Sequence, residues 1–139
     1  MSSGYAGDID PRAAWQLLSE NPQAVLVDVR TEAEWNFVGV PDTSELGRPP
    51  VLAQWNTSSG RNSDFLAELA AAGVQPGTDQ PVLFLCRSGQ RSIAAAQAAT
   101  AAGISQSYNI TEGFEGPLDA AGHRGSAGWR ASGLPWKQS

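Results

Sequence analysis

The single cysteine of the chain opens a short run of residues that suit chemistry on an anion. Two arginines, two serines and a glycine follow it within six positions. A thiolate is a strong nucleophile, guanidinium and hydroxyl groups can hold an anion, and glycine adopts backbone conformations that other residues avoid. A lone cysteine can also be a small core residue, but its neighbours favour a nucleophile in an anion-binding loop. The predicted loop is Cys86, Arg87, Ser88, Gly89, Gln90, Arg91 and Ser92.

This loop lies between a predicted strand and a predicted helix. Residues 81–85 form an apolar run typical of a central strand, and a helix is expected from about residue 91 to 102. The N-terminus of a helix has unpaired N–H groups and a partial positive charge, which attract anions and favour a thiolate. We therefore expect the loop to activate Cys86 and to stabilise charge on an anionic substrate.

Short apolar runs alternate with helical patterns along the whole chain. Strands are predicted at residues 24–27, 51–55, 81–85 and 106–110, and helices at about 11–21, 31–37, 63–73 and 91–102. The alternation indicates an α/β fold with a central parallel sheet of about five strands, flanked by helices on both faces. Such sheets bind ligands beyond the carboxyl ends of their strands, where Cys86 is expected.

The chain of 139 residues has the usual size of one domain. Residues 1–7 are small and polar, so we expect a flexible N-terminus followed by a single domain over residues 8–139. They also lack the basic and apolar regions of a secretory signal, which predicts a cytoplasmic protein. Trp129 and Trp136 are expected to pack the glycine-rich C-terminal part against the body of the domain.

Composition argues against several classes of function. A net charge of −5 gives no general attraction for nucleic acid or for an anionic membrane. No stretch of sequence approaches the roughly 20 apolar residues of a membrane span. One cysteine and one histidine cannot form an internal disulfide or a Cys/His metal cluster, so no metal is expected. Nothing in the sequence suggests an extensive apolar patch, and we expect a monomer.

Four segments, in order, resemble the single-domain rhodanese-like sulfurtransferases. Residues 25–30 with Glu34-Trp35 resemble an early strand of that family, and residues 82–92 resemble its active-site loop with the preceding strand. Residues 109–114 resemble its glycine-rich turn, and residues 133–136 its common ending. The resemblance spans about residues 9–136 and implies the same rhodanese-like fold.

The resemblance also implies a reaction that needs no cofactor. The Cys86 thiolate would attack the outer sulfur of a small anionic donor such as thiosulfate, release sulfite and keep a persulfide. An acceptor thiol, cyanide or a partner protein would then take the sulfur.

Loop length bears on the alternatives. Six residues run from Cys86 to Arg91, whereas related phosphatases of the same fold place the arginine one position later, where this chain has Ser92. This favours a sulfurtransferase over a small cysteine-dependent phosphatase. An arsenate reductase is a further alternative, against which the single cysteine counts. A non-catalytic sulfur carrier or binding module is another alternative, although such modules often lose the nucleophile.

One segment departs from the resemblance, because residues 38–42 stand where most members have Gly-His-Ile-x-Gly-Ala. An extended stretch follows to residue 60. This departure means that the resemblance does not determine how a substrate reaches the site or which substrate it is. Arg48, Trp55 and Arg61 lie in this stretch, and we expect them at surface loop positions.

A few further residues are candidates for a role near the loop. Asp28 and Arg30 end an early strand and can support the loop, with Arg91 as the candidate partner of Asp28. The preferred interpretation of Asp28 is a structural ion pair without a catalytic duty. His123, Glu112 and Glu115 are expected to be solvated surface residues.

Overall fold

A parallel sheet forms the centre of the protein in the computed structural model, which describes residues 4–57 and 60–138. Its five strands have the order β1-β8-β7-β2-β4, and every neighbouring pair is parallel. These strands are β1 (Gly7–Ile9), β2 (Val25–Asp28), β4 (Val51–Leu52), β7 (Val82–Leu85) and β8 (Ser107–Ile110).

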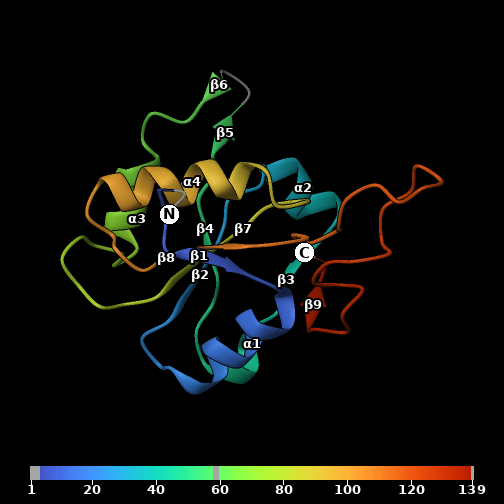
Figure 1. Ribbon diagram of the computed structural model, residues 1–139, viewed down its shortest axis with the longest axis horizontal. Helices are drawn as coiled ribbons and strands as arrows, with labels where there is room; N and C mark the ends of the chain where they lie inside the picture. Colours follow the sequence, from blue (N-terminus) through green and yellow to red (C-terminus); the bar gives the residue numbers. More distant parts are fainter. Residues whose placement is uncertain (1–3, 58–59, 139) are drawn as a thin grey trace.

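Helices cover both faces of this sheet. They are α1 (Pro11–Glu20), α2 (Glu32–Phe37), α3 (Phe65–Ala71) and α4 (Arg91–Ala101). Figure 1 shows α1 on one side of the sheet and α3 and α4 on the other, with α2 near the edge where the strands end. The predicted α/β class, with a central parallel sheet flanked by helices, is confirmed.

Local sequence signals explain where the first helices begin. The carboxylate of Asp10 accepts a hydrogen bond of 2.8 Å from the amide of Ala13, and Pro11 occupies the first turn of α1. Thr31 and Glu34 form a reciprocal capping box at the start of α2. This box turns the chain immediately after β2, so α2 lies beside the carboxyl end of the sheet.

The strand β7 is the centre of the core, since all four of its residues are fully buried. Val82 and Phe84 face α3 and α4, whereas Leu83 and Leu85 pack with α1 and the C-terminal segment. A strand buried on both faces reads as a continuous apolar run, which is why the sequence predicted it well. The same packing fixes the position at which β7 ends and the loop begins.

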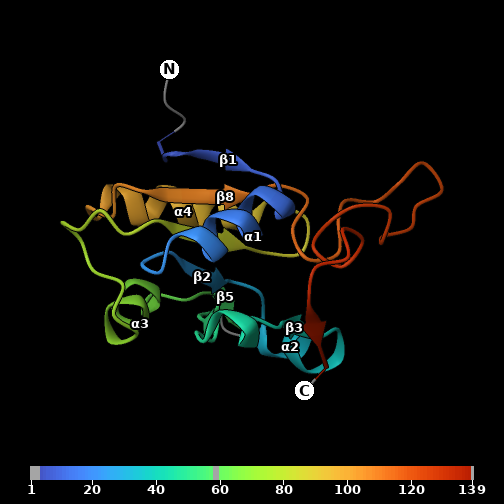
Figure 2. The same ribbon diagram turned by 90° about the horizontal axis from the view of Figure 1, so that it is seen from below.

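Short strand pairs fasten the irregular parts of the chain. The pair β3 (Val40–Pro41) and β9 (Trp136–Lys137) is antiparallel, as is the pair β5 (Asn56–Thr57) and β6 (Gly60–Arg61). A short 3-10 helix, η1, spans Ser44–Leu46. Figure 2 shows the C-terminal strand β9 returning to lie beside β3. The segment that departs from the family resemblance is therefore joined to the C-terminus.

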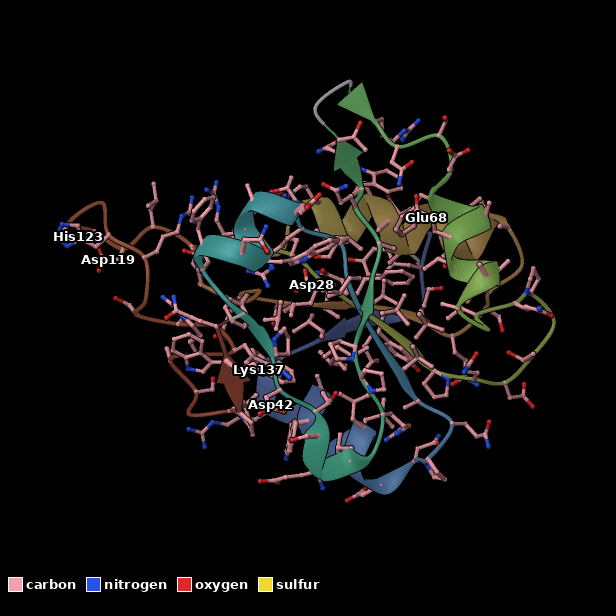
Figure 3. All side chains as sticks on the ribbon, turned by 180° about the vertical axis from the view of Figure 1, so that it is seen from behind. Asp28, Asp42, Glu68, Asp119, His123 and Lys137 are labelled. Atoms are coloured by element: carbon pink, nitrogen blue, oxygen red, sulfur yellow. The ribbon has the colours of Figure 1, made fainter. Side chains whose placement is uncertain are left out.

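Close packing at Gly39 explains one feature of this junction. Its φ is +115°, and a Cβ atom there would lie 2.9 Å from the Trp136 ring and 2.8 Å from the Lys137 carbonyl oxygen. Only glycine fits this position without a shift of its neighbours. Figure 3 shows Asp42 and Lys137 close to each other at the same junction.

The N-terminus differs from the sequence-based expectation. Residues 1–7 were expected to be flexible, but Tyr5 is buried, the amide of Ala6 donates to the carbonyl of Ser107, and Gly7 begins β1. Residues 1–3 lie outside the described residues. The strand escaped prediction because three residues, only one of them apolar and large, carry no periodic signal.

Trp55 and Arg48, in the stretch before residue 60, make packing and hydrogen-bond contacts with the body of the domain. Trp55 was expected at the surface, but it is only 8% exposed and its ring meets Phe65 edge-on at 5.1 Å. The guanidinium of Arg48 donates to backbone carbonyls that include those of Leu18 and Ala24. Arg61 is exposed, with its guanidinium 4.9 Å from the centre of the Trp55 ring. These contacts pack the stretch onto the domain.

The C-terminal part is held by Trp129, which is fully buried and donates from its indole nitrogen to the Pro135 carbonyl at 2.7 Å. The rings of Trp136 and Phe114 also meet edge-on at 6.1 Å. The expected role of both tryptophans in packing the C-terminus is confirmed. Within the described part of the chain, no helix combines the length and the apolar character needed to cross a membrane.

Candidate active site

The predicted loop lies at the carboxyl edge of the sheet, between β7 and α4. Cys86 directly follows β7, and α4 begins at Arg91. The turn after β8 holds the loop from the other side, because the amide of Phe114 donates to the Cys86 carbonyl at 2.8 Å and that of Glu115 donates to the Arg87 carbonyl at 3.0 Å. The loop after β7 is thus held in place by the turn that follows the neighbouring strand β8.

The sulfur atom of Cys86 is buried among hydrogen-bonding groups. The residue is 1% exposed, and its Sγ accepts a hydrogen bond of 3.1 Å from the Gly89 amide. The hydroxyl of Ser92, in the first turn of α4, lies 3.2 Å from the same sulfur. The sulfur therefore lies at the N-terminal end of α4, where the helix dipole favours negative charge.

Two glycines give the loop its shape. Gly89 has a φ of +101°, a conformation that L-residues rarely adopt, and it directs its amide to the Cys86 sulfur. Gly113, with a φ of +64°, packs so closely that a Cβ atom would lie 2.5 Å from the carbonyl oxygens of Cys86 and Arg87. The predicted need for an unusual backbone conformation at Gly89 is confirmed.

An ion pair holds Arg91. Its two terminal nitrogens donate to the two carboxylate oxygens of Glu34 in α2, at 2.7 and 2.9 Å. Burial alone would raise the pKa of Glu34, but hydrogen bonds from Arg91 and Thr31 outweigh it and lower the pKa to about 2. The hydrogen bond to Glu34 in turn raises the pKa of Arg91. The arginine is therefore a fixed cation that interacts with Cys86 and is paired with the Glu34 carboxylate.

Asp28 has a different partner from the one proposed from sequence. Its carboxylate pairs with Arg30, at 2.6 Å to the nearest terminal nitrogen, and both side chains are fully buried. The hypothesis that Asp28 orients Arg91 by direct contact is wrong, because Glu34 makes that contact. Arg30 also donates to the Gly39 carbonyl at 2.7 Å and its guanidinium lies 4.2 Å from the centre of the Phe114 ring.

The remaining loop residues lie nearer to solvent. Arg87 and Gln90 are exposed and Ser88 is half-buried. They are therefore available to meet a substrate or a partner, whereas Gly89 and Ser92 are buried against Cys86. The structure brings the seven predicted residues together as one continuous turn into α4.

Three site residues were not recognised from sequence as parts of the site. Glu34 was named only within Glu34-Trp35 as part of the family resemblance, although its position after an Asp-x-Arg strand is a usable signal. Asn109 is buried at the carboxyl end of β8 and accepts a hydrogen bond from Ser92. Asp8 on β1 accepts a hydrogen bond of 3.0 Å from the Asn109 amide nitrogen. A polar residue within a buried strand, such as Asn109, is the signal that could have located this group.

Residues of the C-terminal loop lie outside the site or play a structural part. His123 is exposed, as expected, and Figure 3 shows it with Asp119 at the outer loop, far from Asp28 at the centre of the domain. Glu112 was expected to be solvated, but it is half-buried, has a φ of +66° and accepts a hydrogen bond of 2.9 Å from the Gly128 amide. Glu115 is also half-buried.

A separate hollow of about 660 Å³ lies between α1, α3 and β4, with a mostly apolar lining, and no residue of the cysteine loop borders it. No cluster of three or more His, Cys, Asp or Glu side chains within residues 4–57 and 60–138 could hold a metal ion. The chemistry of the site therefore centres on one thiol, backbone N–H groups, a hydroxyl and an arginine.

The parallel sheet flanked by helices and the buried cysteine in a loop that opens α4 agree with a rhodanese-like domain. The family model of the STR4 middle domain matches residues 7–139, and the chain belongs to this family. A crystal structure of Rv0390 from M. tuberculosis is 62% identical, with a TM-score of 0.88 over 97% of this chain and 99% of that one.

Other relatives are more distant. The uncharacterized protein RC0915 of Rickettsia conorii is 35% identical over 89% of this chain and 91% of its own length. The thiosulfate sulfurtransferase GlpE of Actinobacillus pleuropneumoniae is 29% identical over 92% and 90%. A solution structure of the polysulfide-sulfur transferase homodimer from Wolinella succinogenes is 26% identical, with a TM-score of 0.65 over 95% of this chain and 78% of that one. The names of the last two relatives support sulfur transfer at the level of the family, whereas RC0915 is uncharacterized.

Proposed function

We propose that the protein is a sulfurtransferase that moves sulfane sulfur through a persulfide on Cys86. The observation that carries the proposal is the position of the Cys86 sulfur at the start of α4, 3.1 Å from the Gly89 amide and 3.2 Å from the Ser92 hydroxyl. The names of two relatives, a thiosulfate sulfurtransferase and a polysulfide-sulfur transferase, agree with this class of reaction.

The first half of the reaction loads the enzyme. The Cys86 thiolate attacks the outer sulfur of thiosulfate, a sulfur–sulfur bond forms, and the bond to the inner sulfur breaks. Sulfite leaves with the electron pair of that bond, and the enzyme keeps a persulfide whose outer sulfur is anionic. The N–H groups at the start of α4 and the positive charge of the exposed Arg87 support an anion at this position.

The second half of the reaction empties the enzyme. An acceptor thiolate or cyanide attacks the outer sulfur, and the Cys86 thiolate leaves with the electron pair of the broken sulfur–sulfur bond. No second cysteine is needed within the chain, which agrees with its single cysteine. No cofactor takes part. We propose that the acceptor is a small thiol or a partner protein in the cytoplasm, and that the protein acts as a monomer without nucleic acid or membrane.

The geometry of Arg91 bears on the phosphatase alternative. A phosphatase of this kind would need its loop arginine to bind the phosphate oxygens with both terminal nitrogens. In this protein Arg91 stands one position earlier than that arginine, and one N–H of each terminal nitrogen already binds the Glu34 carboxylate. Together with the short loop, this arrangement favours sulfur over phosphate as the group that is transferred.

Intact mass spectrometry after incubation with thiosulfate tests the proposal. The wild type is expected to gain about 32 Da, the mass of one sulfur atom, and to lose it on treatment with cyanide. The matched variant Cys86→Ser is expected to gain nothing. An aryl phosphate assay of the same samples should show no turnover.

Three results would contradict the proposal. A Cys86 that reacts with iodoacetamide but takes no sulfur from thiosulfate or polysulfide is not a sulfur-transfer cysteine for these donors. Cys86-dependent hydrolysis of the aryl phosphate would make phosphatase activity the better assignment. Loading without any turnover to cyanide or a thiol would indicate the sulfur-carrier alternative.

A further inference from the structure

A chain of hydrogen bonds connects the edge strand β1 with the sulfur of Cys86. Asp8 accepts hydrogen bonds from the Tyr5 hydroxyl at 2.8 Å and from the amide nitrogen of Asn109 at 3.0 Å. The side-chain oxygen of Asn109 accepts a hydrogen bond from the hydroxyl of Ser92, which lies 3.2 Å from the Cys86 sulfur. Ser92, Asn109 and Cys86 are all at least 98% buried, so water does not compete for these groups.

The direction of each bond in the chain follows from the chemistry of Asp8. An ionised carboxylate can only accept hydrogen bonds, so Asn109 must turn its NH₂ group toward Asp8. Its carbonyl oxygen then faces Ser92 and can only accept. The hydrogen bond to Asp8 also raises the pKa of Tyr5, which keeps that hydroxyl a donor.

The single proton of the Ser92 hydroxyl is the link to the cysteine. When that proton is donated to Asn109, Ser92 presents a lone pair to the Cys86 sulfur. This arrangement suits a neutral thiol, which can donate its S–H to Ser92. A thiolate would instead require Ser92 to turn its proton toward sulfur, which would leave the buried oxygen of Asn109 without a donor.

We propose that Asp8 is a positioning residue that acts through Asn109 and Ser92 to hold part of Cys86 as the thiol in the free enzyme, so that the reactive thiolate is a smaller fraction than the start of α4 alone would give. This hydrogen-bond chain opposes Arg91, whose positive charge interacts with Cys86 and favours the thiolate. Arg91 is itself paired with Glu34 and also interacts electrostatically with Asp28. Arg87 is the other charged residue of the loop, and it is exposed. The inference deepens the proposed function, because it concerns the same nucleophile and rests on its role.

Alkylation of the single cysteine by iodoacetamide tests this proposal without any sulfur donor. In Asp8→Asn the neighbour of Asn109 can donate or accept, so Asn109 can turn and Ser92 can give its proton to the thiolate. The alkylation rate at pH 7 is expected to rise about three- to tenfold, and its midpoint against pH to move down. Circular dichroism melting checks that each variant is folded.

A double-mutant cycle separates the hydrogen-bond chain from the loss of one negative charge. In the Ser92→Ala background, Asp8→Asn is expected to change the rate by less than about twofold, because the link to sulfur is gone. An equal rise in both backgrounds, or no rise in the Asp8→Asn single variant, would overturn the proposal. Failure of sulfur loading with thiosulfate, while the alkylation cycle behaves as described, would count against the proposed function alone.

The infrared S–H stretching band gives a second test that does not depend on the Asp8 variant. The chain has one cysteine, so the band reports Cys86 alone. Donation of the S–H to Ser92 is expected to shift the wild-type band to lower frequency than that of Ser92→Ala. Bands at the same frequency in both proteins would show that the thiol does not donate to Ser92, and the proposal would fall.

Discussion

The guanidinium of Arg91 and the carboxylate of Glu34 form a two-point ion pair, at 2.7 and 2.9 Å, that ties the start of α4 to α2. The two residues are 57 positions apart in sequence. Their side chains are only 23% and 18% exposed, so the pair is sheltered from water on most sides. The Arg91 guanidinium is therefore held in place, and the Glu34 carboxylate partly balances its positive charge before a substrate binds.

This relationship predicts that Glu34→Gln strengthens the binding of an anionic donor. Removal of the carboxylate frees the charge of Arg91, and the KM for thiosulfate is expected to fall about two- to fivefold. The melting temperature should also fall, because about 1 kcal/mol of stability is lost with the pair. Glu32→Gln, an exposed position in the same helix, is the control and should change neither quantity. A lower melting temperature with an unchanged or higher KM would indicate that the pair is structural only.

The same pair makes stability depend on pH in a defined window. The pKa of Glu34 is about 2 in the folded protein, compared with an ordinary value of 4.5. A carboxyl whose pKa is lowered by folding stabilises the protein above its unfolded pKa and loses that effect as the pH falls through its folded value. The difference in unfolding free energy between wild type and Glu34→Gln should therefore be full above pH 4.5 and shrink between pH 4.5 and 2. A difference that stays constant across this window would contradict the assignment.

Gly113 is predicted to be intolerant of any side chain. In Gly113→Ala the new Cβ would meet the carbonyl oxygens of Cys86 and Arg87 at 2.5 Å, in addition to the strain of a φ of +64°. We expect a loss of about 3 kcal/mol or more in stability and a loss of sulfur loading, since the loop must shift. Gly122→Ala is the matched control, because Gly122 also has a positive φ, +80°, but has open space around it. It should cost only about 1 kcal/mol, and similar losses in both variants would argue against the close contact.

Most of the fold could be predicted from the sequence because its central elements carry strong local signals. The buried strand β7 is a continuous apolar run, and the capping residues Asp10 and Thr31 mark two helix starts. The edge strand β1 and the junction of β3 with β9 could not be found in this way. Each is three residues or shorter, and both depend on partners far along the chain.

The candidate site also has a part that the sequence predicts and a part that it does not. The residues from Cys86 to Ser92 are consecutive, so one local motif reveals all of them. The groups that orient them, Glu34, Asn109 and Asp8, come from three other elements and approach only through the packing of the sheet. The sequence offered only Asp28 as the partner of Arg91, and the structure shows Glu34 in that place.

Asp28→Asn is predicted to lower stability much more than catalysis. Asp28 and Arg30 are both fully buried, and the loss of one charge leaves the other without compensation, at a cost of about 3 to 5 kcal/mol. Sulfur transfer per folded molecule should stay within about twofold of wild type, because Arg91 keeps its own partner. Denaturant unfolding, followed by tryptophan fluorescence, and thiosulfate–cyanide turnover should be measured on the same samples.

A double variant, Asp28→Leu with Arg30→Met, completes the test of this buried pair. Replacement of both charges by apolar groups removes the uncompensated ion, so the double variant is expected to recover part of the stability that Asp28→Asn loses. The Gly39 carbonyl, which accepts a hydrogen bond of 2.7 Å from Arg30, would lose this donor and limit the recovery. If Asp28→Asn instead kept its stability and lost more than tenfold in turnover, Asp28 would act on the cysteine loop directly, and its assignment as a structural residue would be wrong.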